Sequence, residues 1–314
     1  MIDFFDNIYY KIRPSNRHKF FLFPILRFIT RILANSLLKY YFLLTKNDKK
    51  YCISPPSDTK PRIIVSLTSF PERINNLWMV IETLLRQQQK PDRIILWLSK
   101  EQHRSINELP KKLIDLQLRG LEIRFCEGDL RSHKKYFYAL QEFKTELVIT
   151  VDDDVLYNSK IISTLLELHL KFPKCVCCNH SSIINFRDNI IQPYKTWKEC
   201  TKSNIPSQEI FPIGVGGILY PPNSISKHAF NIVAIESNCL LADDIWLNVM
   251  TKINDNMVVS SNLKTYYLPV LYKNKTTLTS KNVNQGLNDK QLEDVKNYCI
   301  TELGINPFKD ISKL

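Results

Sequence analysis

Leu147-Val-Ile-Thr-Val-Asp-Asp-Asp154 joins five strand-forming residues to three consecutive carboxylates. A short apolar run of this kind is typical of a buried strand in a parallel sheet. Ligands of open α/β sheets bind at the carboxyl ends of the strands, where this sequence places its densest acidic cluster. On an extended backbone Asp152 and Asp154 point to one side and Asp153 to the other, so two carboxylates can share a hard divalent cation. We therefore predict a metal site here; the alternative is an acidic cap for a helix beginning near Asn158.

Strand and helix patterns alternate on both sides of this stretch. Apolar runs indicate strands over 63–67, 93–98 and 121–126, and apolar spacing of three and four residues indicates helices over 69–88, 111–118 and 132–143. Such alternation predicts a mostly parallel central sheet flanked by helices, with a compact domain beginning after Pro61. The fold class is therefore expected to be α/β and Rossmann-like. A last helix is expected from Asp289 to about Leu303.

The glycine and cysteine content excludes several protein classes. Three of the 7 glycines fall within Gly214–Gly217, which leaves no room for a dinucleotide-binding GxGxxG loop or a GxxxxGK[ST] phosphate loop. The 8 cysteines lack the spacing of a disulfide framework, so a reducing cytosol is expected. Cys175–Cys178 is interpreted as a hydrophobic strand and not as a zinc site.

The first 60 residues carry much of the basic excess. The chain has a net charge of +12, and 11 basic against 4 acidic side chains lie in residues 1–60. Residues 20–44 are too often interrupted by charge to cross a bilayer. On a helical wheel, one face is apolar and an opposite face gathers Arg27, Arg31, Asn35, Lys39 and Lys46. We predict an interfacial helix whose basic face meets an anionic membrane through residues 20–46; the alternative is a helix packed on its own domain. Nucleic-acid binding is not expected.

Beyond the acidic triplet, four motifs agree in order and spacing with the GT-A fold of nucleotide-sugar glycosyltransferases. The chain resembles bacterial surface-polysaccharide enzymes of this fold, family 2-like or exostosin-like, over roughly 62–272. The triplet resembles their DXD motif, and Thr68-Ser-Phe-Pro-Glu-Arg73 resembles the loop that follows the first strand. The remaining resemblances are the helix start Ser132–Tyr136, the glycine segment Phe211–Pro222, and the acidic helix start Ala242–Asn248. Asp243 stands where many relatives have Glu.

The resemblance implies roles for individual residues. Asp152 and Asp154 would hold Mn²⁺ or Mg²⁺, and Asp244 with Asp243 would act as the catalytic carboxylates near the acceptor. The nucleotide-sugar donor, with a UDP-sugar favoured, would contact Thr68, Phe70, Arg73, Lys134, Lys135, Asp152, Asp153, Gly216 and Gly217. From charge alone, Lys134 and Lys135 could equally be a solvated helix face, and Asp243-Asp244 a helix N-terminus complemented by acidic residues.

The combined interpretation is a metal-dependent glycosyltransferase that acts on a glycan or lipid-linked acceptor in bacterial surface-polysaccharide biosynthesis. It would be cytoplasmic and peripheral on the inner face of the cytoplasmic membrane. Residues 1–60 would form the anchor and 61–314 the GT-A domain, divided into a nucleotide half (61–155), an acceptor half (156–272) and a C-terminal lid and helix (273–314). Competing hypotheses are a nucleotidyltransferase, a phosphohydrolase of the haloacid-dehalogenase type, and a non-catalytic membrane scaffold.

Overall fold

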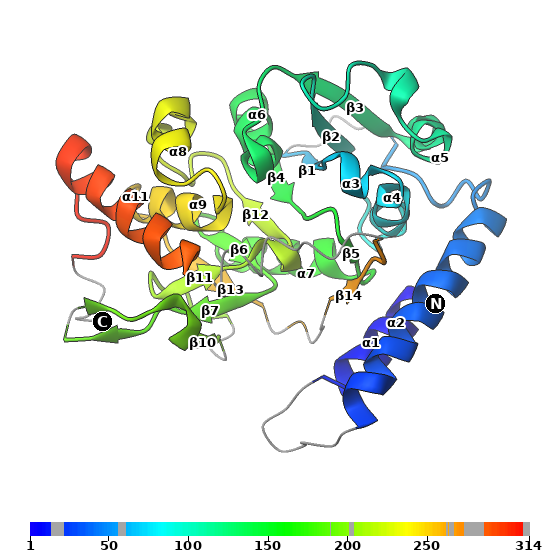
Figure 1. Ribbon diagram of the computed structural model, residues 1–314, viewed down its shortest axis with the longest axis horizontal. Coiled ribbons are helices and arrows are strands. Elements are labelled where there is room, and N and C mark those ends of the chain that lie inside the picture. Colours follow the sequence, from blue (N-terminus) through cyan, green and yellow to red (C-terminus); the bar gives the residue numbers. More distant parts are fainter. Residues whose placement is uncertain are drawn as a thin grey trace.

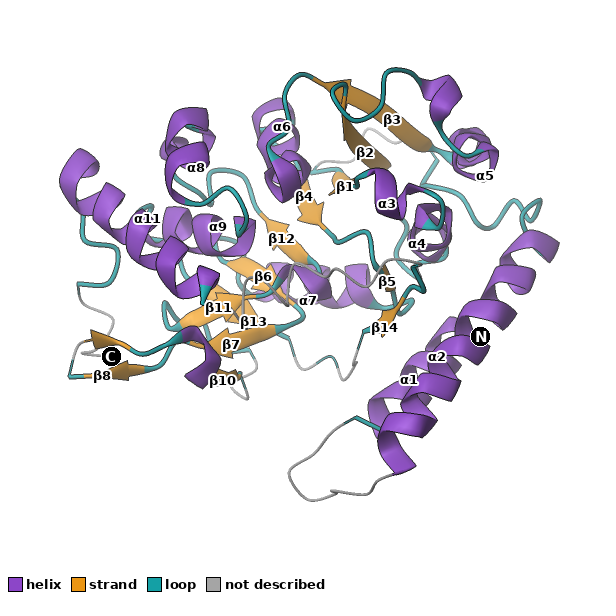
Figure 2. Cartoon of the chain, viewed as in Figure 1, coloured by secondary structure: helices purple, strands orange, loops and turns teal. Residues whose placement is uncertain are grey.

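The computed structural model describes residues 1–13, 22–55, 61–188, 190–200, 204–261, 263, 267–272 and 286–309. A central sheet runs through the molecule with helices on both faces, and a pair of N-terminal helices lies along one side (Figures 1 and 2). Residues 273–285, which include most of the expected lid, lie outside the described residues, as do Phe20 and Phe21.

Seven strands form the central sheet. In spatial order they are β13 (Val258–Ser260), β6 (Val176–Cys178), β12 (Ile218–Tyr220), β4 (Leu147–Thr150), β1 (Ile63–Thr68), β2 (Arg93–Ser99) and β3 (Leu121–Cys126). β12 is antiparallel to β4 and β6, and every other neighbouring pair is parallel. The predicted α/β class with a mostly parallel sheet is confirmed. The triplet follows β4 at the middle of the sheet, where the chain order of the strands changes direction.

Side-chain alternation along β1 explains how the two faces are covered. Val65 and Leu67 join the large core that includes α4 (Leu77–Leu85) and α7 (Ile161–Lys171). Ile64 belongs to a separate core on the opposite face, where α6 (Lys134–Glu142) packs. Because both faces are buried, the strand is apolar almost throughout, as a parallel strand requires. The cysteines of β6 are buried in the strand as expected, and all 8 are free.

The part of the chain after β6 forms mainly short elements. Its helices are α8 (Ile232–Asn238), α9 (Asp243–Lys252) and α11 (Leu287–Leu303), which pack on one another. Small sheets pair β10 (Lys198–Glu199), β7 (Ser181–Ile183) and β11 (Ile210–Pro212), and pair β8 (Phe186–Arg187) with β9 (Ile190–Ile191). A further pair, β5 (Val155–Leu156) and β14 (Leu268–Pro269), lies directly after the triplet.

Element boundaries depart from expectation in three places. The helix expected over 69–88 is divided into α3 (Pro71–Ile74) and α4, because Asn75 and Asn76 interrupt it. The helix expected over 111–118 is a single α-helical turn, α5 (Lys111–Ile114), continued by a 3-10 helix. α6 begins at Lys134 after a 3-10 turn.

The two N-terminal helices are α1 (Ile2–Lys11) and α2 (Leu22–Leu44). Their buried side chains, which include Phe5, Leu38 and Phe42, belong to the same core as β1 and α4. The face of α2 that meets the rest of the protein carries Arg31 and Asn35, which bond to residues 269–270, and Arg27, which donates to the Tyr9 hydroxyl of α1 at 3.3 Å. The expectation that these three side chains face a membrane is therefore wrong. The apolar wheel face is left exposed along the whole helix: Leu22, Ile25, Leu26, Ile29, Ile32, Leu33, Leu37, Tyr40 and Leu44.

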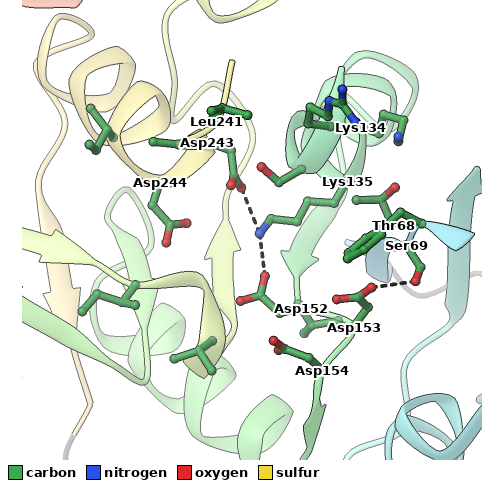
Figure 3. A pocket seen from close by; sticks show the side chains of 18 of the residues that line it. Thr68, Ser69, Lys134, Lys135, Asp152, Asp153, Asp154, Leu241, Asp243 and Asp244 are labelled. Carbon is green, nitrogen blue, oxygen red and sulfur yellow. Dashed lines mark hydrogen bonds and ion pairs between the residues drawn. The ribbon is translucent and has the colours of Figure 1, made fainter. Parts of the chain in front are cut away.

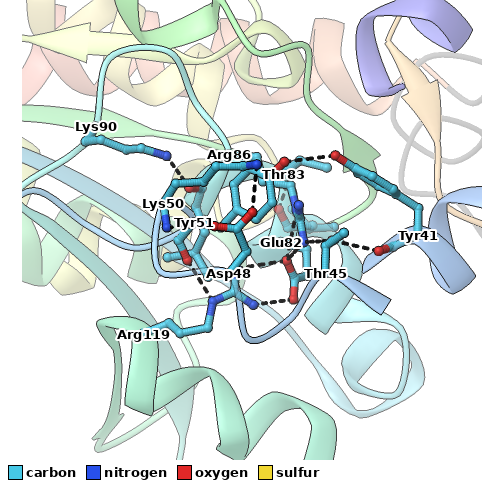
Figure 4. A network of polar contacts seen from close by, with 12 residues as sticks. Tyr41, Thr45, Asp48, Lys50, Tyr51, Glu82, Thr83, Arg86, Lys90 and Arg119 are labelled. Carbon is cyan, nitrogen blue, oxygen red and sulfur yellow. Dashed lines mark hydrogen bonds and ion pairs between the residues drawn. The ribbon is translucent and has the colours of Figure 1, made fainter. Parts of the chain in front are cut away.

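A polar network fixes the carboxyl end of α2 to α4 (Figure 4). Arg86 donates to Thr45 Oγ1 at 2.9 Å and pairs with Glu82 at 2.9 Å, and its guanidinium lies 3.7 Å from the centre of the Tyr51 ring. Arg119 pairs with the other oxygen of Glu82 at 2.5 Å and donates to the Tyr51 carbonyl at 2.7 Å. Buried charges are stable only when paired in this way, so the connection after α2 is held in one position. The division of the chain at residue 60 remains a prediction, which truncation can test.

Among the helices in the described ranges, none is both long enough and apolar enough to span a bilayer.

Candidate active site

One cavity of about 530 Å³ opens at the carboxyl ends of β1, β2 and β4 and is closed on its far side by the start of α9 (Figure 3). The acidic triplet lies on its floor. The wall formed by α9 carries Asp243 and Asp244, and α6 contributes Lys134 and Lys135. The two halves of the expected site, about 90 residues apart in the chain, therefore face one another across one cavity.

Lys135 joins these two halves. Its ammonium lies 2.7 Å from Asp152 Oδ1 and 2.9 Å from Asp243 Oδ2, and the side chain is only 4 % exposed (Figure 3). Lys134 is equally buried and pairs with Asp129. The structure therefore rejects the alternative of a solvated helix face for both lysines. Burying an ammonium costs several kcal/mol unless it is paired, and burial here is outweighed by Asp152 and Asp243, which keep the pKa of Lys135 well above its usual value.

The three carboxylates of the triplet have different surroundings. Asp153 points into the protein, where it accepts from Ser69 Oγ at 2.6 Å and from Arg73. Asp152 and Asp154 remain 30 % and 34 % exposed toward the cavity. Arg73 also lies 3.0 Å from Asp154 Oδ2. Burial, with a further contribution from Asp153 and Asp152, raises the pKa of Asp154 to about 7 despite Arg73.

The carboxylates of α9 also differ from each other. Burial would raise the pKa of Asp243, but Lys135 and His133 outweigh it and the pKa is lowered. Burial raises the pKa of Asp244 to about 7, and the neighbouring Asp243 adds to the shift. Asp244 Oδ2 accepts from the Gly214 amide at 2.9 Å, whereas Oδ1 is buried with no hydrogen-bond partner among the described residues. Asp243 is thus held ionised, whereas the pKa of Asp244 lies near neutral pH.

The residues present fit a divalent cation that is shared with a substrate. Asp152 and Asp154 offer the hard oxygen donors that Mn²⁺ and Mg²⁺ prefer, and a cation would offset both the burial and the carboxylate repulsion that raise the pKa of Asp154. Within the described ranges, no cluster of three or more His, Cys, Asp or Glu side chains is arranged to hold a metal by itself. Diphosphate oxygens of a bound molecule have the chemistry to serve as further ligands of such a cation.

Most of the predicted donor-binding residues line the cavity. They are Thr68, Phe70, Arg73, Lys134, Lys135, Asp152 and Asp153. Gly216 and Gly217 do not: a methyl group on Gly216 would lie 2.7 Å from His180 Cβ, and Gly217 packs near Leu165. Gly214 is the glycine that approaches the site, since a Cβ there would lie 2.9 Å from Asp244 Oδ1 and 3.1 Å from Lys135 Nζ.

A polar cluster at the ends of β2 and β3 was not predicted. Asp129 pairs with Lys134, accepts from Gln102 at 2.6 Å and lies 3.0 Å from Arg131. Gln102, Asp129, Arg131 and Ser132 all line the cavity. The sequence could have indicated this cluster, because Gln102 and Asp129 follow shortly after the carboxyl ends of two predicted parallel strands, where ligands of such sheets bind.

Comparison with known proteins yields structural likeness only. No protein-family model and no curated protein matches the chain. Among solved structures, the mannosyltransferase PcManGT from Pyrobaculum calidifontis, in complex with GDP-Man and Mn²⁺, is 12 % identical over 90 % of this chain and 78 % of its own, with a TM-score of 0.44. Residues 1–349 of S. aureus TarS match at 13 % identity over 66 % of this chain and 59 % of that one, with a TM-score of 0.40. The 2-C-methyl-D-erythritol 4-phosphate cytidylyltransferase IspD from Francisella tularensis matches at 16 % over 73 % and 98 %, with a TM-score of 0.37. Likeness at this level says nothing about activity, which has to be inferred from the site itself.

Proposed function

We propose that this protein is a metal-dependent glycosyltransferase that moves a sugar from a nucleoside-diphosphate sugar, preferably a UDP-sugar, to a glycan or lipid-linked acceptor. The observation that carries the proposal is the single cavity in which the Asp152–Asp154 triplet faces the Asp243-Asp244 pair, with Lys135 between them. One wall can hold a diphosphate through a cation, and the opposite wall offers a carboxylate that can accept a proton.

In the proposed reaction, an acceptor hydroxyl attacks the anomeric carbon of the donor as the bond from that carbon to the diphosphate oxygen breaks. The hydroxyl proton passes to Asp244, whose pKa of about 7 suits a proton acceptor at neutral pH. Lys135 keeps Asp243 ionised and supplies positive charge close to the leaving diphosphate. When bound by Asp154 and Asp152, Mn²⁺ or Mg²⁺ would neutralise charge on the departing phosphate oxygens.

The exposed face of α2 supports a membrane location for this reaction. Its apolar side chains form one continuous stripe, the exposed Lys39 lies on the helix beside that stripe, and the exposed Lys46 follows just after the helix ends at Leu44. Asp3 and Asp6 of α1 are turned inward and bind Ser159 and Asn158. The arrangement suits an anionic lipid surface, and it is the basis for proposing a peripheral enzyme on the inner face of the cytoplasmic membrane that acts in bacterial surface-polysaccharide synthesis.

The competing activities break different bonds, so one experiment separates them. The full-length protein is incubated with UDP- and GDP-sugars and Mn²⁺, and the products are followed by ³¹P NMR. Slow transfer to water that releases nucleoside diphosphate supports glycosyl transfer. Release of nucleoside monophosphate and sugar phosphate would indicate nucleotidyl chemistry. Because a nucleoside-diphosphate sugar has no terminal phosphate, a phosphate monoester is offered separately, and release of inorganic phosphate from it would indicate a phosphohydrolase.

Two variants make the result specific. Asp244→Asn removes the proposed proton acceptor, whereas Glu293→Gln changes an exposed carboxylate of α11 that does not line the cavity and serves as the control. Loss of nucleoside-diphosphate release in the first variant alone is expected. If no donor gives a product and no nucleotide binds, the hypothesis of a non-catalytic membrane scaffold would explain the protein better.

A further inference from the structure

The segment from Leu268 to Tyr272 connects α2 to the acidic triplet. On one side it holds the backbone of the triplet: the Val270 amide donates to the Asp154 carbonyl at 2.8 Å, and the Tyr272 hydroxyl donates to the Asp153 carbonyl at 2.6 Å. β14, which begins this segment, pairs with β5 immediately after the triplet. The strand pairing, which the Val270 amide extends to Asp154, and the Tyr272 hydroxyl thus place this segment against the turn that presents Asp153 and Asp154.

On its other side the same segment is held by α2. Asn35 Nδ2 donates to the Pro269 carbonyl at 3.0 Å, and Asn35 Oδ1 accepts from the Leu271 amide at 3.0 Å. Arg31 donates to the Val270 carbonyl at 3.1 Å. The buried amide of Asn35 therefore pairs with the backbone edge as a neighbouring strand would, which explains a polar residue in the middle of the buried face of a helix.

The far side of the segment is fixed as well. Asn76, just before α4, donates to the Leu271 carbonyl at 2.7 Å, and the guanidinium of Arg73 lies 5.6 Å from the centre of the Tyr272 ring. Arg73 is the same side chain that pairs with Asp153 and Asp154. The backbone between α2 and the triplet thus has partners at consecutive residues, and a displacement on the α2 side reaches the triplet through one peptide segment.

We propose that α2 is a structural part of the metal and donor site, and that Asn35 is a positioning residue that sets the Asp153–Asp154 turn through residues 269–272. The inference rests on the proposed function only in expecting Asp154 to hold a metal. It gives α2 two tasks on two faces: the exposed apolar stripe for a lipid surface, and the Arg31–Asn35 face for the catalytic turn.

The test uses the full chain carrying Asn35→Leu, which keeps the size of the side chain and removes the amide. Hydrogen exchange of peptides covering 151–157 and 268–272 is compared with wild type, and the affinity for Mn²⁺ alone is measured by electron paramagnetic resonance. We expect faster exchange in both peptides and a loss of Mn²⁺ affinity of about 10- to 100-fold, as is typical when a partner that orients a metal ligand is removed.

Leu38→Ala is the matched control, because Leu38 is fully buried on the same helix and has no polar contact with residues 269–271. It should lower the melting temperature without the local increase in exchange at 151–157. Tyr272→Phe removes a single link, and its effect on exchange should not add to that of Asn35→Leu if both act through one segment. Unchanged exchange at 151–157 in a folded Asn35→Leu protein would overturn the proposal. Absence of Mn²⁺ binding by wild type would instead contradict the proposed function, and the exchange comparison would still decide the role of Asn35.

Discussion

Gly214→Ala offers the sharpest perturbation of the site, because one added methyl group meets three groups of the proposed machinery. Its Cβ would lie 2.9 Å from Asp244 Oδ1, 3.1 Å from Lys135 Nζ and 3.3 Å from Asp152 Oδ1. Ordinary contacts to a carbon are about 3.5 Å or longer, so each group must move by a few tenths of an ångström. The φ angle of Gly214 is not in the left-handed region, and backbone strain makes no contribution.

We expect Gly214→Ala to change both the stability and the turnover of the protein. Overpacking of this kind costs about 1–3 kcal/mol of stability, and misplacement of catalytic groups lowers turnover on the order of 100-fold. Nucleoside-diphosphate release and thermal unfolding measure the two effects separately. Gly304→Ala, at the end of α11, is the control: it is strained by its φ of +68° but has nothing within 4 Å of the added Cβ, so it should lose stability without losing turnover. Wild-type turnover in Gly214→Ala would refute the tight arrangement of Asp244, Lys135 and Asp152.

Three further predictions concern single side chains. Asp244→Asn should lower transfer by roughly 10²- to 10⁴-fold while metal-dependent nucleotide binding is kept, as kinetics and calorimetry can show. Leu33→Gln should weaken sedimentation with phosphatidylglycerol vesicles by about tenfold or more, since one exposed leucine contributes roughly 1.5–3 kcal/mol when buried in lipid; Leu118→Gln, at another exposed leucine, should leave sedimentation unchanged. Burial lowers the pKa of Lys252 to about 7, so the unfolded state binds more protons between about pH 7 and 10 and the free energy of unfolding should rise with pH there. Lys252→Met should remove this rise in urea titrations at pH 7 and 9, and an unchanged pH dependence would contradict the assignment.

The central sheet and the position of the triplet could be predicted because they depend on local patterns. Leu147–Val151 is apolar enough to be a buried strand, and the end of a parallel strand is a ligand site by geometry alone. The facing of Asp243-Asp244 toward the triplet did not follow from such patterns. It came from the resemblance to a known fold, and the cavity now places both acidic groups together.

Other features depend on tertiary contacts that no local pattern encodes. Lys134 and Lys135 look like a solvated pair until Asp129, Asp152 and Asp243 are seen around them. The spacing of three glycines does not tell which of them approaches a ligand.

The helical wheel of α2 likewise separates two faces without saying which one meets protein. Asn35 faces inward because the backbone at residues 269–271 offers matching hydrogen-bonding groups. That partner lies more than 230 residues away in the chain, so a helical wheel of α2 alone cannot predict the contact. Amphipathicity therefore predicted the helix correctly and the surroundings of three of its polar side chains, Arg27, Arg31 and Asn35, wrongly.

The central claim is that the cavity binds a nucleoside diphosphate through a cation held by Asp154. Its most direct test is calorimetric titration of the full-length protein with UDP and GDP, in Mn²⁺ and then in EDTA, for wild type and Asp154→Asn. We expect one nucleotide to bind wild type in Mn²⁺, and binding to be lost both in EDTA and in the variant. Equal binding by wild type and Asp154→Asn, or binding that persists in EDTA, would contradict the claim.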